Sequence, residues 1–294
     1  MVTEAATQDH YCWTTDSVRL HFRDAPGDPD RPALLCLPGL TRNLRDFDAL
    51  AAHFAPRHRV VSTSFRGRGE SGYAKDPLTY VPLTYLQDVG RVIEAAGLQR
   101  FIVIGTSLGG LIGLLLDVTQ KGRIAGLVLN DLGPDMESAG LARVRAQVGR
   151  GNGWPTWLHA ARDLAEKQAA IYPDWSLEEW LAHTKRLCRV SRQGRIIWDY
   201  DAQISAPFAL PNTDAALDLW LALEAYRDRP MLSIRGALSD IFSAATQAEM
   251  LRRMPEMAGV TIANVGHAPT LMEPAALAAL EAWLNSFEKE RHHG

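Results

Sequence analysis

The segment 105–109, GTSLG, constrains the fold more than any other part of this chain. An apolar run at 101–104 enters it, and the helix-like apolar run 111–116 leaves it. A sharp turn from a strand into a helix lifts the Ser107 hydroxyl above the sheet, and the two flanking glycines remove side chains that would clash there. This context favours an exposed, reactive serine over an ordinary turn with a capping serine.

Apolar runs alternate with helical patterns along most of the chain. The run at 33–37 is continuous, as expected for a strand buried on both faces of a sheet, and 124–130 is expected to form another strand. Further strands are expected at 18–22, 59–64, 101–104, 231–235 and 260–263, and helices at 84–96 and 274–287. This alternation predicts an α/β fold with a mostly parallel central sheet and helices on both of its faces.

A long segment without a clear strand pattern separates the apolar run at 124–130 from the one at 231–235. Its helical patterns lie at 141–148, 157–171, 177–190 and 214–226. An insertion at this point would lie above the carboxyl ends of the strands, where open α/β sheets bind ligands. We therefore expect a core formed by residues 1–134 and 230–294, and an inserted helical cap formed by residues 135–229.

A serine hydroxyl becomes a useful nucleophile only when a base takes its proton, and the base must be oriented by a third group. His267 is the candidate base for Ser107. It follows the last expected strand within the segment 264–269, NVGHAP, whose small residues leave the ring room to turn toward the serine.

Two carboxylates follow expected strands and could orient His267. Asp240 comes after the run at 231–235, and Asp131 comes after the run at 124–130. Both lie between the nucleophile and the histidine in the chain, in the order that this architecture requires. We favour Asp240, because the GP pair at 133–134 is typical of a turn and suggests that Asp131 begins the cap.

The negative charge that develops on an attacked carbonyl needs two convergent backbone N–H donors, which form an oxyanion hole. Leu108 follows the serine at a helix N-terminus, where the helix dipole adds to its N–H. The second donor should come from the loop after 33–37, which reads PGLTRN. Gly39 permits a tight turn in that loop, so the N–H of Leu40 is the expected second donor.

The motifs for common cofactors are absent or lack their structural context. The segment 67–72, GRGESG, matches the dinucleotide pattern G-x-G-x-x-G, but loop-forming residues follow it where a helix would have to begin. Neither the H-E-x-x-H spacing of zinc sites nor a phosphate-binding G-x-x-x-x-G-K-[ST] loop occurs. We therefore expect no cofactor and no metal ion.

With these features the chain resembles an α/β-hydrolase of the esterase or lipase type with a helical cap. The resemblance rests on the segments 37–39, LPG, 66–71, RGRGES, 105–110, GTSLGG, and 266–269, GHAP. It implies Ser107 as nucleophile, His267 as base, Asp240 as acid and a small or medium carboxylic ester as substrate. The chain departs from the usual family pattern at Pro38, where histidine is common, and at Ser64, where aspartate is common.

Other activities share this fold. A lactonase or a C–C bond hydrolase would use the same triad, and a ligand receptor without turnover could use the same scaffold. Relatives that act on epoxides or haloalkanes carry aspartate at the position of Ser107, which argues against those activities.

The predicted cap contains six of the eight tryptophans, which either line an apolar pocket or pack the cap helices. These are Trp154, Trp157, Trp175, Trp180, Trp198 and Trp220.

Composition and charge limit the partners. The net charge of −3 and the isoelectric point near 6.3 give no reason to expect binding to nucleic acid or to a membrane. No apolar run approaches the ~18 residues of a membrane span, and residues 1–13 lack the pattern of a secretory signal. Three widely spaced cysteines argue against a disulfide framework. We expect a cytoplasmic enzyme whose partner is a small-molecule ester, and nothing in the sequence specifies its oligomeric state.

Overall fold

The computed structural model of the chain describes residues 7–151, 153–209 and 218–289. The strands of its central sheet are β1 (Gln8–Trp13), β2 (Arg19–Ala25), β3 (Ala33–Leu37), β4 (Val60–Ser64), β5 (Phe101–Thr106), β6 (Ile124–Asn130), β9 (Met231–Gly236) and β10 (Ala258–Ile262). Within the described residues these eight strands lie in the order β1-β2-β4-β3-β5-β6-β9-β10. The pairs β1–β2 and β2–β4 are antiparallel, and all other neighbours are parallel.

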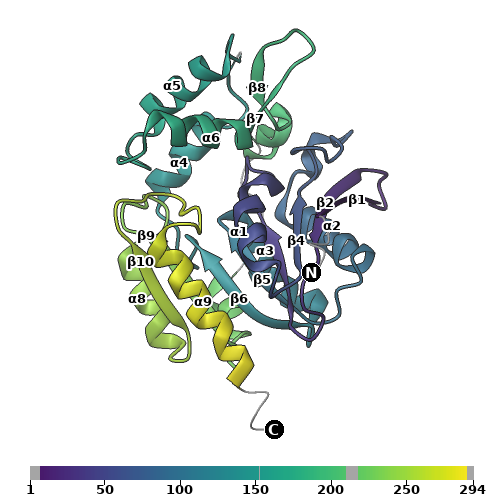
Figure 1. Cartoon of the computed structure of the whole chain (residues 1–294), viewed down its shortest axis with the longest axis vertical. Helices are drawn as coiled ribbons and strands as arrows, with labels where there is room; N and C mark the ends of the chain where they lie inside the picture. Colours follow the sequence, from purple (N-terminus) through teal and green to yellow (C-terminus); the bar gives the residue numbers. More distant parts are fainter. Residues whose placement is uncertain (1–6, 152, 210–217, 290–294) are drawn as a thin grey trace.

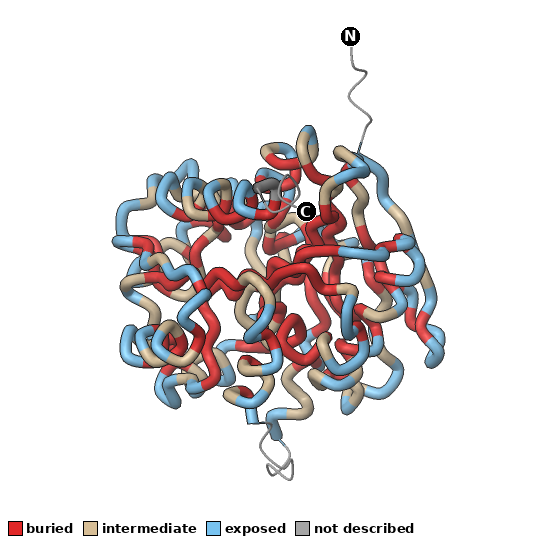
Figure 2. Tube along the Cα trace, turned by 90° about the horizontal axis from the view of Figure 1, so that it is seen from below, coloured by how far each residue is buried: buried red, intermediate tan, exposed pale blue. Residues whose placement is uncertain are grey.

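Helices cover both faces of this sheet (Figure 1). The covering elements are α1 (Asp48–Phe54), α2 (Pro82–Ala95), α3 (Leu108–Gln120), α8 (Ala244–Arg253) and α9 (Pro274–Lys289), with short 3₁₀ turns η1 (Leu44–Phe47) and η2 (Pro77–Thr79). Buried side chains run through the centre of the molecule (Figure 2) and form two clusters. Leu35 of β3 packs with α2 and α3 on one face, and its neighbour Leu34 packs with α1 and α9 on the other. The predicted α/β fold is confirmed.

Among the strands of the central sheet and the α-helices that cover it, β1, α1 and α8 were not predicted from the sequence. β1 is an edge strand that pairs only with β2, and its side chains are largely exposed, so it lacks the apolar run of the inner strands. In the described part of the chain no helix is both long and apolar enough to cross a membrane.

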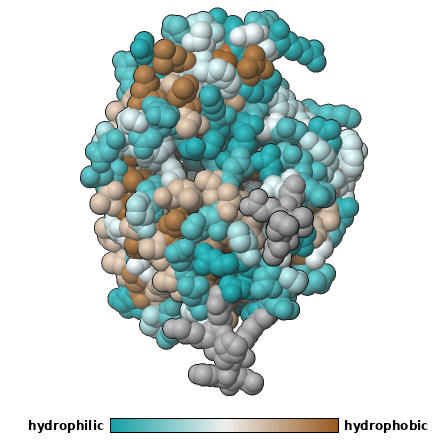
Figure 3. All heavy atoms as spheres, in the orientation of Figure 1, coloured by the Kyte–Doolittle hydropathy of each residue, from teal (hydrophilic) through white to brown (hydrophobic). Residues whose placement is uncertain are grey.

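Between β6 and β9 the chain forms an insertion that lies above the carboxyl ends of the strands (Figure 1). Figure 3, drawn in the same orientation, shows hydrophobic residues in the upper part of the molecule, where this insertion lies. The predicted helix at 177–190 ends earlier, because the backbone becomes extended at Cys188 and enters a short antiparallel hairpin. The elements are α4 (Ser138–Gln147), α5 (Trp157–Gln168), α6 (Leu177–Leu187), β7 (Cys188–Val190), β8 (Ile196–Trp198), η3 (Ala202–Ala209) and α7 (Leu219–Glu224).

The helix α7 lies within the predicted cap range 135–229 but packs against the core. Leu223 is fully buried, and the Tyr226 hydroxyl just after the helix donates a hydrogen bond to the Gly113 carbonyl of α3 at 2.7 Å. Of the helix predicted at 214–226, residues 214–217 lie outside the described residues. The boundary of the cap stays a prediction, and the packing of α7 favours an end before residue 219.

The turn between β5 and α3 has no space for side chains at its two glycines. A Cβ atom on Gly105 would lie 2.4 Å from the Gly109 carbonyl oxygen, and one on Gly109 would lie 2.0 Å from the Leu37 carbonyl oxygen. Both neighbours are backbone atoms, so relief of the clash requires movement of the chain itself. The glycines therefore allow α3 to begin directly against the end of β3.

We expect Gly109→Ala to lower the free energy of unfolding by roughly 1–3 kcal/mol, the usual cost of overpacking a well-packed interior. Urea unfolding followed by circular dichroism measures the change. Gly90→Ala is the matched control, because Gly90 lies in α2 with nothing within 4 Å of the added atom. That variant should gain up to about 1 kcal/mol from helix propensity. Equal stability of Gly109→Ala and wild type would contradict the close packing at this turn.

Candidate active site

Ser107 occupies the turn between β5 and α3, as the sequence predicted. Its backbone has φ 51° and ψ −116°, a conformation that costs energy for a residue with a side chain and that is concentrated at functional sites. The Ser107 N–H donates to the Asn130 carbonyl of β6 at 3.0 Å, which ties the turn to the neighbouring strand. The hydroxyl thereby stands at the carboxyl edge of the sheet.

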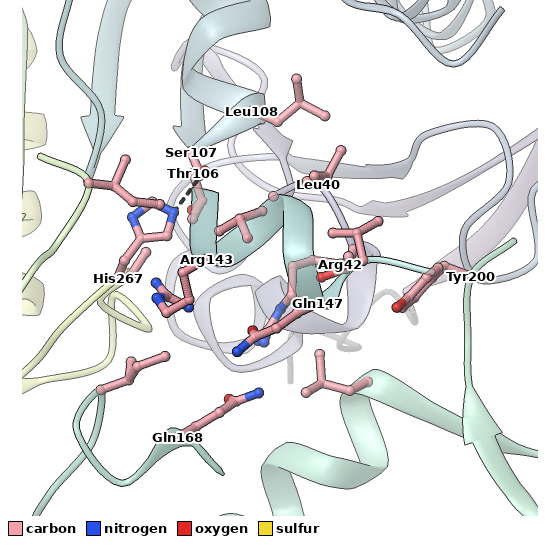
Figure 4. Close-up of a pocket in the computed structure, with 18 of the residues that line it drawn as sticks. Leu40, Arg42, Thr106, Ser107, Leu108, Arg143, Gln147, Gln168, Tyr200 and His267 are labelled. Atoms are coloured by element: carbon pink, nitrogen blue, oxygen red, sulfur yellow. Dashed lines mark hydrogen bonds between the residues drawn. The ribbon is translucent and has the colours of Figure 1, made fainter. Parts of the chain in front are cut away.

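The imidazole of His267 joins the serine to a carboxylate. Its Nε2 lies 2.8 Å from Ser107 Oγ (Figure 4), and its Nδ1 lies 2.6 Å from Asp131 Oδ2. A proton on Nδ1 satisfies both contacts: Nδ1–H donates to the carboxylate, and Nε2 accepts from the serine hydroxyl. This arrangement prepares the imidazole to remove the serine proton.

Asp131 follows β6 directly and is fully buried. Its Oδ1 accepts a hydrogen bond from the Gly236 N–H at 2.7 Å, and its Oδ2 accepts one from the Ser239 hydroxyl at 2.6 Å. Together with His267, these donors stabilise a carboxylate that burial would otherwise disfavour. Sequence reasoning missed Ser239, whose only signal was its place just after β9.

Asp240, which the sequence analysis favoured as the partner of His267, does not hold that position, and the preference was wrong. Its two oxygens accept hydrogen bonds from Arg143 Nε at 2.6 Å and Nη2 at 2.8 Å, and its side chain is 43% exposed. The hydrogen bonds from Arg143 hold the pKa of Asp240 below its usual value. After Gly236 the chain turns, and the Ser239 N–H donates a hydrogen bond to the Gly236 carbonyl. As a result the Ser239 side chain faces Asp131, while the Asp240 side chain faces Arg143 of α4.

The loops of both expected oxyanion donors reach Ser107. Leu108 is the first residue of α3, so its N–H has no acceptor within the helix. A Cβ atom on Gly39 would lie 3.8 Å from Ser107 Cβ, which places the loop after β3 beside the nucleophile. Leu40 and Leu108 line the same cavity as Ser107 (Figure 4). The donor roles of the two N–H groups stay a prediction.

Arg68 supports the loop that carries Leu40, a role that sequence reasoning missed. It lies in the segment 67–72 that matched the dinucleotide pattern, and no α-helix follows that segment until α2. The guanidinium is fully buried, and Nε donates to the Leu40 carbonyl at 2.8 Å. Nη1 donates to the Tyr85 hydroxyl at 3.0 Å, so the loop is anchored to α2.

A cavity of about 730 Å³ opens beside Ser107 and His267 and extends under the insertion. Of the six tryptophans in the predicted cap, Trp154 and Trp198 line it. Trp175 and Trp180 pack against Tyr172 instead, with ring centroids 3.6 Å and 5.8 Å from the Tyr172 ring. In the described ranges no group of three or more His, Cys, Asp or Glu side chains is arranged to hold a metal ion.

Comparisons with known proteins agree with this fold. The model of the alpha/beta hydrolase family matches residues 34–280. The chain is 34% identical over 260 residues to the 3-hydroxybutyrate-oligomer hydrolase of Cupriavidus necator, with 86% of this chain and 88% of that protein covered. A crystal structure of an alpha/beta hydrolase from Novosphingobium aromaticivorans has 47% sequence identity and a TM-score of 0.91, with 95% of this chain and 98% of that chain covered.

Proposed function

The chain belongs to the alpha/beta hydrolase family, and from this premise we propose that it is a serine hydrolase that cleaves carboxylic esters through an acyl-enzyme. The observation that carries the proposal is the hydrogen-bonded series from Ser107 through His267 to Asp131, with distances of 2.8 Å and 2.6 Å. This series stands at the wall of a cavity whose volume lies within the roughly 300–1,000 Å³ typical of small-molecule sites.

In the proposed mechanism Ser107 Oγ attacks the ester carbonyl while His267 Nε2 takes the hydroxyl proton. Asp131 accepts a hydrogen bond from His267 Nδ1 and stabilises the imidazolium that forms. The N–H groups of Leu40 and Leu108 donate to the oxyanion. His267 then protonates the leaving alcohol, and in the second half of the cycle it removes a proton from the water that releases the acid from Ser107.

The relatives favour esters over the alternatives. The protein from Cupriavidus necator is named for hydrolysis of 3-hydroxybutyrate oligomers, which are linear esters. The structural similarity to an N-acyl homoserine lactonase has 18% identity and shows the fold alone. We therefore place linear carboxylic esters first, ahead of lactones and of C–C bonds.

Steady-state assays on a small panel test this proposal: 4-nitrophenyl acetate and butyrate, a γ-lactone and a vinylogous diketone. We expect repeated turnover of the aryl esters, with intact-protein mass spectrometry showing an acyl adduct of +42 for acetyl (about the mass of C₂H₂O) only as a transient. Much faster cleavage of the diketone would indicate a C–C hydrolase instead. One product per protein with a lasting adduct would indicate a receptor.

A further inference from the structure

Cationic side chains dominate the charged part of the cavity wall. Among the described residues that line it there are six cations and one carboxylate, that of Asp46. The charge of Arg143 is balanced by Asp240 at 2.6 Å, and that of Lys167 by Asp163 at 2.7 Å. Figure 4 shows Arg42 and Arg143 among the residues that line the same cavity as Ser107 and His267. The six cations are Arg42, Arg143, Arg145, Arg150, Lys167 and Arg186.

Two of these cations converge with Asp46 and a buried histidine. Arg42 forms a two-pronged pair with Asp46, with Nε–Oδ2 at 2.6 Å and Nη2–Oδ1 at 2.8 Å. Arg186 Nε lies 3.9 Å from the same carboxylate, too far for a hydrogen bond. The pair of guanidinium groups and one carboxylate leaves an excess of one positive charge at this part of the wall.

His183 lies between the two arginines and adds a hydrogen-bond donor to this part of the wall. The ring is fully buried; its Nε2 lies 3.2 Å from Arg42 Nη1, and its Nδ1 lies 3.3 Å from Arg186 Nη2. Burial and the two neighbouring guanidinium groups lower the pKa of His183 well below its usual value, so the ring is neutral. A neutral imidazole has only one acceptor nitrogen, so it accepts from one arginine and presents an N–H to the other.

Arg186 is held in place by its backbone, while its side chain stays accessible. Its carbonyl, near the end of α6, accepts hydrogen bonds from Asn43 Nδ2 at 3.0 Å and from Arg45 Nη2 at 2.8 Å. These bonds fasten α6 to the loop after β3. The side chain is 32% exposed and lines the cavity, so the guanidinium can contact a ligand there.

This cluster lies close to the nucleophile. The point that a Cβ atom on Gly39 would occupy is 3.2 Å from Arg42 Cγ and 3.8 Å from Ser107 Cβ. A small substrate whose ester group contacts Ser107 therefore lies close to Arg42, and Arg186 lines the same cavity. A guanidinium binds a carboxylate through parallel hydrogen bonds that are shorter and stronger than neutral ones.

We propose that Arg186, assisted by Arg42, binds a free carboxylate of the substrate, so that the enzyme prefers carboxylic esters that also carry an acid group. This specificity rests on the proposed ester hydrolysis at Ser107. The substrate class is short hydroxyacid oligoesters and half-esters, whose free carboxylate pairs with the excess positive charge.

A pair of esters that differ only in charge tests the proposal: 3-acetoxybutyrate and its neutral analogue 3-acetoxybutanamide. We expect wild type to favour the acid in kcat/KM by about tenfold or more, the effect of a charge-assisted hydrogen bond. Arg186→Met should bring the ratio close to one, mainly through a higher KM for the acid. Arg186→Lys, which retains the charge but loses the planar fork, should keep an intermediate ratio.

The matched control is Lys185→Met, which removes one positive charge from the exposed side of the same helix and should keep the wild-type ratio. Circular dichroism checks that α6 is folded in each variant. Equal rates on both esters in wild type would overturn the carboxylate site and leave ester hydrolysis standing. Calorimetric titration of the Ser107→Ala protein with both compounds gives an independent reading: tighter binding of the acid, lost with Arg186→Met, supports the site even where no ester is cleaved.

Discussion

Ser107→Ala should abolish ester hydrolysis, with a fall in kcat on the order of 10⁶, the loss measured for a triad nucleophile in a well-studied protease. The hydroxyl lies 2.8 Å from His267 Nε2, so its removal leaves the base without a nucleophile to activate. Labelling by a fluorophosphonate probe, which forms its bond with an activated serine, should disappear as well.

The fold should survive this change, because alanine removes one oxygen atom at the cavity wall. The midpoint of thermal unfolding therefore serves as the check that lost activity is not lost structure. Ser286→Ala is the matched control: Ser286 lies on α9, its hydroxyl bonds to the Trp283 carbonyl, and it does not line the cavity. Full ester turnover by Ser107→Ala would refute the serine mechanism.

Asp131→Asn should lower kcat by about 10⁴, by analogy with the same change in a known triad. Asparagine has nearly the same shape, but its neutral amide no longer stabilises the imidazolium form of His267. An amide nitrogen facing Nδ1 would also force the ring into the other tautomer, with a proton on the nitrogen that must accept one from Ser107. Steady-state kinetics on an aryl ester measures the loss.

Asp240→Asn is the matched control for that experiment, because it makes the same substitution at the other candidate acid. It weakens a partly exposed ion pair with Arg143, which contributes little in water, about 0–1 kcal/mol. We expect less than a tenfold change in kcat. A dead Asp240→Asn enzyme beside an active Asp131→Asn enzyme would return the acid role to Asp240.

Most of the core could be predicted because its strands are buried on both faces. The run that forms β3 is apolar at every position, the run that forms β6 is apolar up to its last residue, Asn130, and the observed bounds of both strands match the predicted ones. The turn at Ser107 was equally clear, since only glycine fits at 105 and 109. β1 was missed for the opposite reason: an edge strand with exposed side chains carries a weak pattern.

The pocket was only partly predictable. The sequence showed a cap with many tryptophans, but their faces depend on how α5, α6 and the β7–β8 hairpin pack. Trp198 lies in β8, a three-residue strand that pairs with the equally short β7, and neither showed a strand signal. The convergence of Arg42 and Arg186, 144 positions apart in the printed sequence, also depends on where α6 ends over the loop after β3.

The sequence by itself indicated Ser107 as the candidate nucleophile and His267 as its candidate base, because each lies in a local motif: a glycine-flanked serine between strand and helix, and a histidine among small residues after the last strand. It led us to favour Asp240 as the acid, which was wrong, because both aspartates follow strands and the segments around them do not show which one faces His267. Tertiary structure decided between them. Thr106 and Asn130 pair in register on adjacent strands, so Ser107 and Asp131 leave the sheet side by side. β9 lies one strand further from β5, and the turn after Gly236 aims Ser239 at the site and Asp240 away from it, toward Arg143. Strand order and the direction of one turn are non-local properties, and no segment of the sequence carries them alone.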